Sequence, residues 1–500
     1  MKNILDINGL YFSYPHYSEN QEAALPLFRG LDLTIRPGEF TVIAGAPESG
    51  KTSLSRILSG LIPRYTGGEY RGSVRISGHD LFESRPQDLM DQAGVIFQNP
   101  DEQLLTTRVD SEIAFPLESL GIPGQEIDRR VQRELTRFEL SSMAERNPAT
   151  LSGGEKKRLL CAVLAAIDPP FWILDETLDE VDPLWQTRII SYLLKREAAV
   201  LLFSSKISDK FAGGGAKTYI LSEGRLEMYR EQAPDLAIRE GLLLPGGPLP
   251  STGSGRTAAP SMTGSPVLSV RDLEYSYPDK GEFRLRIDEF DLYRGEVCTL
   301  AGPNGCGKTT LAKLLCGLYT AERGSIQMDT RDTQGPTASI RGQSSYSSSL
   351  RTSAAYIFQN PDYQIFLPTV EEELAYGLKE MKMKPDQIKE LVGTASRLFR
   401  LPPPDTAPAL MSYGTRKRLQ AATYWLLRRP VCILDEADSG LSIKDFLDVL
   451  TCFRTEGHTV LIITHNESFA RRFSDRIVLM KQGRIVHEDT QGFFTGGYTR

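Results

Sequence analysis

Two segments of the chain have the residue types and spacing of phosphate-binding loops. They are GAPESGKTS at 45–53 and GPNGCGKTT at 302–310. Both match GxxxxGK[ST], and in each the glycines let the backbone curl so that its N–H groups face a phosphate. A helix predicted after each loop would add the positive end of its dipole. Lys51 and Lys308 would then reach the β- and γ-phosphates, while Thr52 and Thr309 would ligate Mg²⁺.

We therefore predict a nucleoside triphosphate and Mg²⁺ as the ligands of both loops, with the whole of each loop in contact with the nucleotide. The contact residues predicted in the first loop are Gly45, Ala46, Pro47, Glu48, Ser49, Gly50, Lys51, Thr52 and Ser53. Those in the second loop are Gly302, Pro303, Asn304, Gly305, Cys306, Gly307, Lys308, Thr309 and Thr310.

Downstream of each loop an apolar segment ends in Asp-Glu. These segments are WILDE at 172–176 and CILDE at 432–436. A carboxylate at the end of such a strand can hold Mg²⁺ through water, which is the role predicted for Asp175 and Asp435. The adjacent Glu176 and Glu436 are the candidates to polarise the attacking water. A lone acid at a strand end can instead cap a helix, but the pairing with a phosphate loop favours catalysis.

The elements that must position these residues occur twice in the chain. Four landmarks recur in the same order at offsets of 257 to 261 residues, which indicates a duplicated domain. Continuous apolar strands alternate with helical patterns in each copy and predict an α/β fold with a mostly parallel sheet. We expect one domain at 1–231, a flexible linker rich in Pro, Gly and Ser at 232–266, and a second domain at 267–500. A Ser-rich segment at 333–353 is expected to be a surface insertion.

Composition excludes several classes of protein. The 500 residues are 40% hydrophobic and 24% charged, with a net charge of −6, which is ordinary globular composition without a basic signal for nucleic acid. Six cysteines without a CxxC pair argue against a disulfide scaffold or a zinc ribbon. Neither a signal peptide nor an apolar stretch of membrane-spanning length is expected, so a role at a membrane requires a partner.

LSGGEKKR at 151–158 resembles the signature of ABC ATPases, and both copies resemble that family over nearly their whole length. The resemblance implies two tandem ATPase domains that pair within the chain, each with a phosphate-loop core, an antiparallel β part and a helical subdomain. It also implies that each nucleotide lies between the phosphate loop of one copy and the signature of the other. The residues that it adds to the site are the signature Ser152, Gly153 and Gly154, the Q-loop Gln98 and Gln359, which touch Mg²⁺ and water, the adenine-stacking Tyr14 and Tyr277, the switch His465, and the D-loop Asp182.

FQNPDEQL at 97–104 and FQNPDYQI at 358–365 are similar to the ATPases of energy-coupling factor (ECF) importers. That likeness implies uptake of a vitamin, a vitamin precursor or a transition-metal ion, driven by ATP hydrolysis. The partners implied are a transmembrane coupling protein, which docks in grooves near the Q-loops, and a small membrane subunit that captures the substrate. The chain would then be a peripheral protein at the cytoplasmic face of the membrane.

Departures from the family pattern concern one of the two composite sites. Ser205 stands where the first copy should have its switch histidine, and the opposing signature is MSYGT, with Tyr413 and Thr415 as replacements. Ser442 replaces the D-loop aspartate of the second copy. At this position the backbone must approach the phosphate closely, which glycine permits because it lacks a Cβ. A tyrosine should obstruct that approach. We expect the first site to bind ATP but to hydrolyse it slowly, although a Ser-Tyr variant site that stays competent is the alternative.

Three other functions are considered, of which the first, a nucleotide-sensing interaction protein without turnover, is disfavoured by the complete second site. Two more remain. One is the fused ATPase of another ABC importer class, such as the sugar importers, against which the FQNPDxQ segments speak. The other is a soluble ABC ATPase that acts on ribosomes or DNA, for which the iron–sulfur cysteines, charged linker or coiled-coil insertions are missing.

Overall fold

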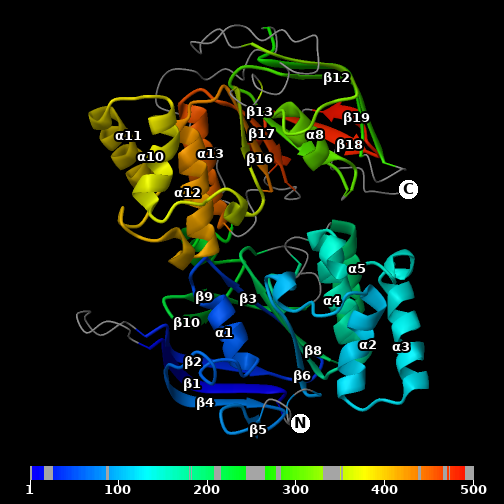
Figure 1. Cartoon of the computed structure of the whole chain (residues 1–500). Helices are drawn as coiled ribbons and strands as arrows, with labels where there is room; N and C mark the ends of the chain where they lie inside the picture. The colour runs from blue at the N-terminus through cyan, green and yellow to red at the C-terminus, as the bar shows by residue number, and fades with distance from the viewer. Residues whose placement is uncertain are drawn as a thin grey trace. The chain divides into compact units, whose positions relative to one another are not determined.

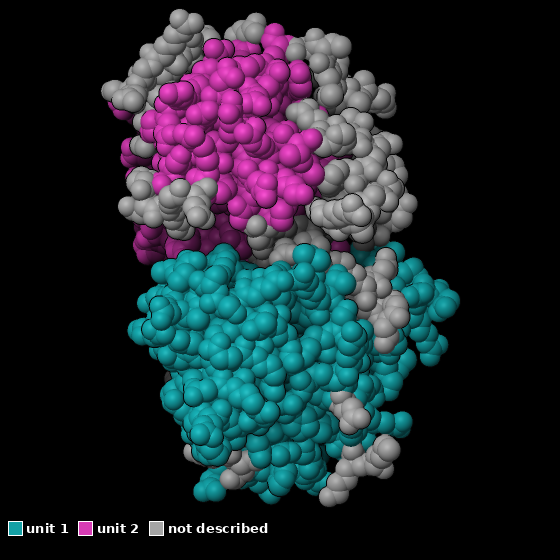
Figure 2. All heavy atoms as spheres, turned by 90° about the vertical axis from the view of Figure 1, so that its right-hand side faces the viewer, with its two compact units in different colours: residues 1–244 teal, residues 245–500 magenta. Residues whose placement is uncertain are grey.

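A computed structural model of the chain divides it into two compact units, residues 1–244 and 245–500, coloured separately in Figure 2. The residues described by the structure are 3–15, 26–85, 89, 91–178, 181, 183–196, 198–207, 215–243, 265–277, 283–303, 305–329, 350, 353–436, 441–464, 470–471 and 473–489. Within these ranges no helix is both long and apolar enough to cross a bilayer.

The core of unit 1 is a six-stranded sheet in the order β10-β9-β3-β8-β7-β6 (Figure 1). Its strands are β3 (Phe40–Gly45), β6 (Ala93–Ile96), β7 (Phe171–Asp175), β8 (Ala199–Ser204), β9 (Lys217–Ser222) and β10 (Arg225–Met228). Every residue of β3, β7 and β8 is buried, and these strands pair in parallel. Only a parallel sheet covered on both faces buries such continuous apolar strands, so the predicted α/β fold is confirmed.

A second, antiparallel sheet and a set of helices complete the described part of unit 1. The sheet contains β1 (Leu5–Ser13), β2 (Phe28–Ile35), β4 (Glu69–Ile76) and β5 (His79–Asp80) in the order β2-β1-β4-β5. The helices are α1 (Lys51–Leu58), α2 (Val109–Ser119), α3 (Gly124–Arg137), α4 (Gly153–Ile167), α5 (Pro183–Leu194) and α7 (Asp235–Arg239). Figure 1 shows α2, α3, α4 and α5 gathered on one side of the core sheet, where Ile113, Val131 and Leu159 share one apolar cluster.

Unit 2 repeats this plan. Its core strands lie in the order β15-β16-β17-β13-β18-β19, which is the order of unit 1 read from the opposite edge, with β15 equivalent to β6 and β19 to β10. The strands are β13 (Val297–Ala301), β15 (Ala354–Ile357), β16 (Val431–Asp435), β17 (Thr459–Ile463), β18 (Arg476–Lys481) and β19 (Arg484–Asp489). Its antiparallel sheet contains β11 (Leu268–Ser276), β12 (Arg284–Leu292) and β14 (Arg323–Met328). Its helices are α8 (Lys308–Leu315), α10 (Val370–Glu380), α11 (Pro385–Leu398), α12 (Tyr413–Leu426) and α13 (Ile443–Thr455).

Part of the segment predicted to be a flexible linker is folded. Residues 232–243 include α7, and Ala237 and Leu242 are buried against Ala44 and Ile220 of the core sheet. Apolar side chains within this Pro- and Gly-containing stretch explain the difference, because burying them offsets the entropy lost on folding. The remainder of the predicted linker up to 264, and most of the predicted insertion at 333–353, lie outside the described residues.

Candidate nucleotide sites

Both predicted phosphate loops lie between a buried strand and the start of a helix. β3 leads into the loop before α1, and β13 leads into the loop before α8 (Figure 1). Gly50 and Gly307 precede the two helices with φ of 101° and 107°, a conformation that side chains other than glycine rarely adopt. At Gly302 a Cβ would lie 2.3 Å from the Met480 carbonyl oxygen, so this turn also requires glycine.

The lysine of each loop is buried and turned back over the loop. Lys51 Nζ donates to the carbonyl oxygens of Gly45 and Ala46 at 2.6 and 3.0 Å. Lys308 Nζ donates to the carbonyl oxygens of Gly302 and Pro303 at 2.9 and 3.0 Å. The loop therefore surrounds an ammonium group, and the same charge can bind the β- and γ-phosphates of a nucleotide.

The two tyrosines predicted to stack on adenine occupy equivalent positions. Tyr14 OH lies 2.8 Å from Ser53 Oγ, and Tyr277 OH lies 2.8 Å from Thr310 Oγ1. Each hydroxyl is thus tied to the first turn of the helix that follows the phosphate loop. Tyr14 is 40% exposed, which leaves its ring available for stacking.

The aspartates at the ends of β7 and β16 are buried, but their surroundings differ. Neither carboxylate oxygen of Asp175 has a hydrogen bond of ordinary geometry within the described part of the chain, although the Thr52 hydroxyl and the Lys51 ammonium are close enough to lower the pKa of the carboxyl. Burial raises the pKa of the Asp175 carboxyl to about 7, and the neighbouring Glu176 carboxylate adds to the rise. Asp435 instead accepts hydrogen bonds from Tyr356 OH and, at 3.3 Å, from Thr309 Oγ1.

These surroundings fit Mg²⁺. The Asp175 carboxylate is buried without a hydrogen bond of ordinary geometry, which is costly, and a hard cation that takes oxygen ligands would offset that cost. Asp175 with Thr52, and Asp435 with Thr309, are the residues that would hold the ion beside the nucleotide phosphates. When bound, Mg²⁺ would neutralise charge on those phosphates.

Tyr356, whose role no sequence motif indicates, orients the second aspartate. Replacing it with phenylalanine removes one donor from the buried Asp435 carboxylate, whose ionised form the donor stabilises. We expect Tyr356→Phe to raise the Mg²⁺ concentration for half-maximal ATP hydrolysis about tenfold, the effect of losing a hydrogen bond to a charged group. Tyr192→Phe, which removes a hydroxyl bonded to Arg137 and Arg196 in unit 1, is the matched control. Equal Mg²⁺ dependence in the two variants would contradict this role.

The candidate catalytic glutamates follow directly. Glu176 and Glu436 have φ of 47° and 49°, a left-handed conformation unusual for this residue type. Their backbone N–H groups donate to the Phe203 and Ile463 carbonyls at 3.1 and 2.9 Å, which holds the chain in this conformation. Backbone outliers of this kind concentrate at functional sites, since the surrounding structure has to maintain them.

The Q-loop glutamines point at these glutamates in both units. Gln98 Nε2 donates to Glu176 Oε2, and Gln359 Nε2 donates to Glu436 Oε2, both at 2.8 Å. In unit 1 the other oxygen of Glu176 also lies 3.3 Å from Lys51 Nζ. The structure therefore brings together the predicted glutamine, glutamate and phosphate-loop lysine, which are far apart in the sequence.

A second lysine supports each glutamate and was missed in the sequence. Lys157 Nζ donates to the Glu176 carbonyl at 3.1 Å, and Lys417 Nζ donates to the Glu436 carbonyl at 2.9 Å. Both lysines are buried in the signature helices α4 and α12. The available signal was the shared Lys-Arg-Leu of LSGGEKKRL and MSYGTRKRL, in which a lysine lies on the apolar face of the helix.

Residues of the FQNPDxQ motif form hydrogen bonds within the Q-loop. Asn99 caps the short helix 100–102 by accepting from the Asp101 N–H at 3.1 Å. Gln103 accepts from the Phe97 N–H at 2.7 Å and donates to the Val95 carbonyl at 2.9 Å. The corresponding residues of unit 2 form equivalent bonds. The motif therefore shapes the loop that carries the glutamine.

The same motif joins the Q-loop to the signature helix. Lys156 Nζ lies 2.6 Å from Asp101 Oδ1 in unit 1, and Arg416 Nε lies 2.9 Å from Asp362 Oδ1 in unit 2. Each aspartate follows a Q-loop glutamine, and each cation belongs to the first turns of α4 or α12. The ion pair therefore links the Q-loop to the signature helix of the same unit.

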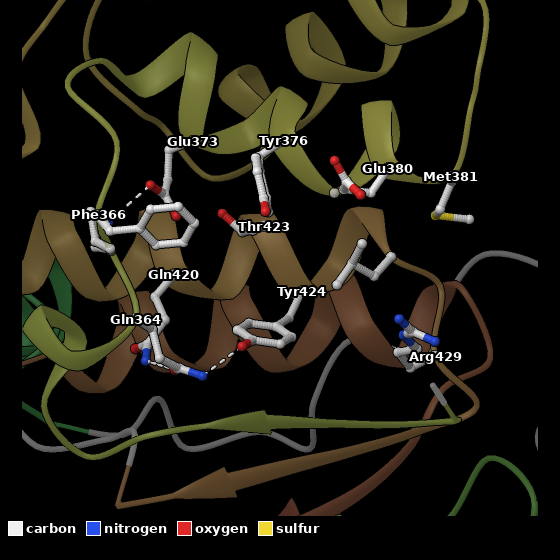
Figure 3. A pocket seen from close by; sticks show the side chains of 13 residues that line it. Gln364, Phe366, Glu373, Tyr376, Glu380, Met381, Gln420, Thr423, Tyr424 and Arg429 are labelled. Atoms are coloured by element: carbon white, nitrogen blue, oxygen red, sulfur yellow. Dashed lines mark hydrogen bonds between the residues drawn. The ribbon is translucent and has the colours of Figure 1, made fainter. Parts of the chain in front are cut away.

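A pocket of about 400 Å³ lies beside this loop in unit 2, between α10 and α12 (Figure 3). Tyr376 and Glu380 line it from α10, and Thr423 and Tyr424 from α12. Gln364 of the motif donates to Tyr424 OH at 2.6 Å on the pocket wall.

In each unit a buried glutamate accepts hydrogen bonds from backbone N–H groups of the segment that follows the Q-loop. Glu373 Oε2 accepts from the N–H group of Phe366 at 3.1 Å (Figure 3) and from that of Leu367 at 2.9 Å. Glu112 accepts from the corresponding N–H groups of unit 1. Sequence reasoning missed these glutamates as well, although VDSE and VEEE align in the two copies.

Signature residues begin the helices α4 and α12. Ser152 is the N-cap of α4 and forms a capping box with Glu155, in which the two residues exchange side-chain to backbone hydrogen bonds. Gly153 and Gly154 are the first two residues of that helix. In unit 2 Ser412 caps α12, and Tyr413 and Thr415 fall in its first turn.

Of the remaining residues singled out in the sequence, the structure describes two and leaves three outside the described ranges. Ser442 is the N-cap of α13 and accepts from the Asp445 N–H at 3.0 Å, so it has a capping role in its own unit. Ser205, which follows β8, is buried. His465, Asp182 and Asn304 lie outside the described residues.

Comparison with known proteins adds family information. A family model described as ABC transporter matches residues 28–179 and 285–439. A protein of Methanosarcina acetivorans described as an ABC transporter ATP-binding protein is 29% identical over 536 residues, covering 96% of this chain and 84% of that protein. A Treponema denticola protein with the same description is 28% identical and covers 97% of this chain and 96% of that protein.

Two solved structures are similar to parts or most of the chain. One is cbiO1 of Clostridium perfringens, part of the ABC transporter complex cbiONQ, with 28% identity and a TM-score of 0.40 over 45% of this chain and 88% of that one. The other is the archaeal ribosome recycling factor aABCE1, with 19% identity and a TM-score of 0.60 over 93% of this chain and 89% of that one. At this identity the second likeness concerns the fold.

Proposed function

The chain belongs to the ABC transporter family as an ATP-hydrolysing protein with two tandem domains, and from this we propose that it is the motor of an ECF-type importer. Its ATP hydrolysis would drive uptake of a vitamin, a vitamin precursor or a transition-metal ion. The observation that carries the proposal is the FQNPDxQ motif in both units, together with the ion pair that joins it to each signature helix. A loop coupled to the signature in this way suits transmission of force between the nucleotide and a bound partner.

The proposed partner is a transmembrane coupling protein that docks in the pocket beside the Q-loop of unit 2. Tyr376, Phe366 and Met381 contribute exposed apolar surface at this pocket, with 45%, 66% and 53% exposure. Apolar surface with a polar floor is typical of a protein-binding groove. A second, small membrane subunit would capture the substrate, and the chain would lie at the cytoplasmic face of the membrane.

We further propose that the two domains pair within the chain so that each nucleotide is held by the phosphate loop of one unit and the signature of the other. The site on the second loop would combine Lys308, Gln359 and Glu436 with Ser152 of unit 1. The site on the first loop would face Tyr413 in place of a glycine. This sequence difference supports unequal sites, of which the second hydrolyses most of the ATP.

Purification of the tagged full chain from solubilised membranes of its host tests the importer proposal. We expect a multi-span protein and a smaller membrane protein to copurify. Tyr376→Glu should abolish this association, because a buried charge in the groove is costly. Leu398→Glu on α11, at an equally exposed position (45%) outside the groove, should preserve it. Recovery with ribosomes and without membrane proteins would favour a soluble function, and a periplasmic sugar-binding partner would favour another importer class.

A further inference from the structure

The tyrosine that interrupts the second signature forms a bond inside its own unit. Tyr413 is the first residue of α12, and its hydroxyl donates to the Gln359 carbonyl oxygen at 2.8 Å. Gln359 is the Q-loop glutamine of unit 2. The substitution that disfavours one nucleotide site thus places a hydroxyl on the backbone of a residue from the other site.

The contact continues to the candidate catalytic glutamate. Gln359 Nε2 donates to Glu436 Oε2 at 2.8 Å, so the hydroxyl is two hydrogen bonds away from that carboxylate. Lys417, one turn along α12, lies 5.4 Å from the centre of the Tyr413 ring and donates to the Glu436 carbonyl at 2.9 Å. A cation over an aromatic ring is attracted to its face, which helps to hold the ring in place.

Unit 1 provides an internal comparison. Both units have the ion pair between the signature helix and the aspartate after the Q-loop, formed by Lys156 with Asp101 and by Arg416 with Asp362. At the position equivalent to Tyr413, unit 1 has Gly153, which has no side chain to reach its Q-loop. The hydroxyl contact is therefore an addition specific to the second unit.

We infer that Tyr413 is a positioning residue for the second nucleotide site, holding the Gln359 backbone so that its amide stays directed at Glu436. This inference rests on the roles proposed above for Gln359 and Glu436. Side-chain amides act on water or Mg²⁺ only when their backbone is fixed, since sub-ångström displacements of positioning groups reduce rates. The replacement of glycine by tyrosine would then lower ATP hydrolysis at the first site while supporting it at the second.

The test measures ATP hydrolysis by the full chain carrying Glu176→Gln, so that turnover reports the second site. We expect Tyr413→Phe, which keeps the ring over Lys417, to lower kcat about fivefold, as one lost hydrogen bond predicts, with KM for ATP unchanged. Tyr413→Gly, which restores the glycine of the family signature, should be slowed at least as much. Turnover in these variants that equals or exceeds that of the chain carrying Glu176→Gln alone would overturn the inference.

Two controls separate positioning from a structural effect. Tyr363→Phe removes a hydroxyl from the same loop at a position 78% exposed, and should leave kcat unchanged. In a Gln359→Ala background, Tyr413→Phe should have no further effect, because the hydroxyl acts through that side chain. The same fivefold loss in both backgrounds would show a merely structural role. If Gln359→Ala alone leaves kcat unchanged, the role proposed for Gln359 fails; if it is slow and Tyr413→Phe is not, only the inference about Tyr413 fails.

Discussion

Replacement of Glu436 by glutamine should lower steady-state ATP hydrolysis by the full chain about 100-fold or more. A positioned general base contributes roughly 10² to 10⁴ in rate, and an amide cannot accept the proton of the attacking water. The structure supports this role, since Glu436 has a φ of 49°, receives the Gln359 amide at 2.8 Å and has its carbonyl held by Lys417. Phosphate release at saturating Mg²⁺ and ATP measures the loss.

The matched control is Glu176→Gln in unit 1. Glu176 has the same backbone conformation and the same glutamine contact, so the local environments of the two variants are alike. We expect Glu176→Gln to keep most of the turnover, because the first site would face the interrupted signature. Binding of ATP should persist in both variants, since neither phosphate-loop lysine changes. Abolished activity in Glu176→Gln with most activity kept in Glu436→Gln would reverse the assignment of the two sites.

The second large effect concerns stability. Arg476, the first residue of β18, and Glu296, which precedes β13, form a buried ion pair with exposures of 3% and 1%. Nε of Arg476 lies 2.6 Å from Glu296 Oε1, and Nη2 donates to the Asp291 carbonyl. Arg476→Met leaves Glu296 buried without this cation, which should destabilise unit 2 by about 3–5 kcal/mol. For a unit of this size the thermal midpoint of its transition should fall about 10 °C.

Two further variants identify the cause of that loss. Arg286→Met removes a half-exposed arginine 3.6 Å from Glu274 in the same unit, and should cost less than about 1 kcal/mol because water screens the pair. The double variant Arg476→Met with Glu296→Leu should recover part of the loss, since no buried charge then remains. Calorimetry of the full chain reports the transition of unit 2. Equal shifts for Arg476→Met and Arg286→Met would contradict a buried-charge effect.

Much of the site was predictable because the residues that bind phosphate are contiguous. Gly50, Lys51 and Thr52 lie in a loop whose spacing predicts phosphate binding, and the second copy of the loop at Lys308 strengthens that prediction. The α/β fold followed from continuous apolar strands such as 171–175, which only a covered parallel sheet can bury. The folded part of the expected linker was not predicted, since the apolar contacts of Ala237 form with strands distant in the sequence.

The sequence by itself determined two nucleotide-binding domains, their order and the unequal signatures, because these depend on local spacing and on residue types. Only the tertiary structure decided how distant groups cooperate. It placed Tyr356 on Asp435, Lys417 on the Glu436 carbonyl and Tyr413 on the Gln359 carbonyl. Such contacts depend on which strand ends and helix termini the fold brings within hydrogen-bond distance. From the sequence, Tyr413 predicts a loss of activity at one site, whereas in the fold its hydroxyl donates a hydrogen bond to the Q-loop backbone of its own unit.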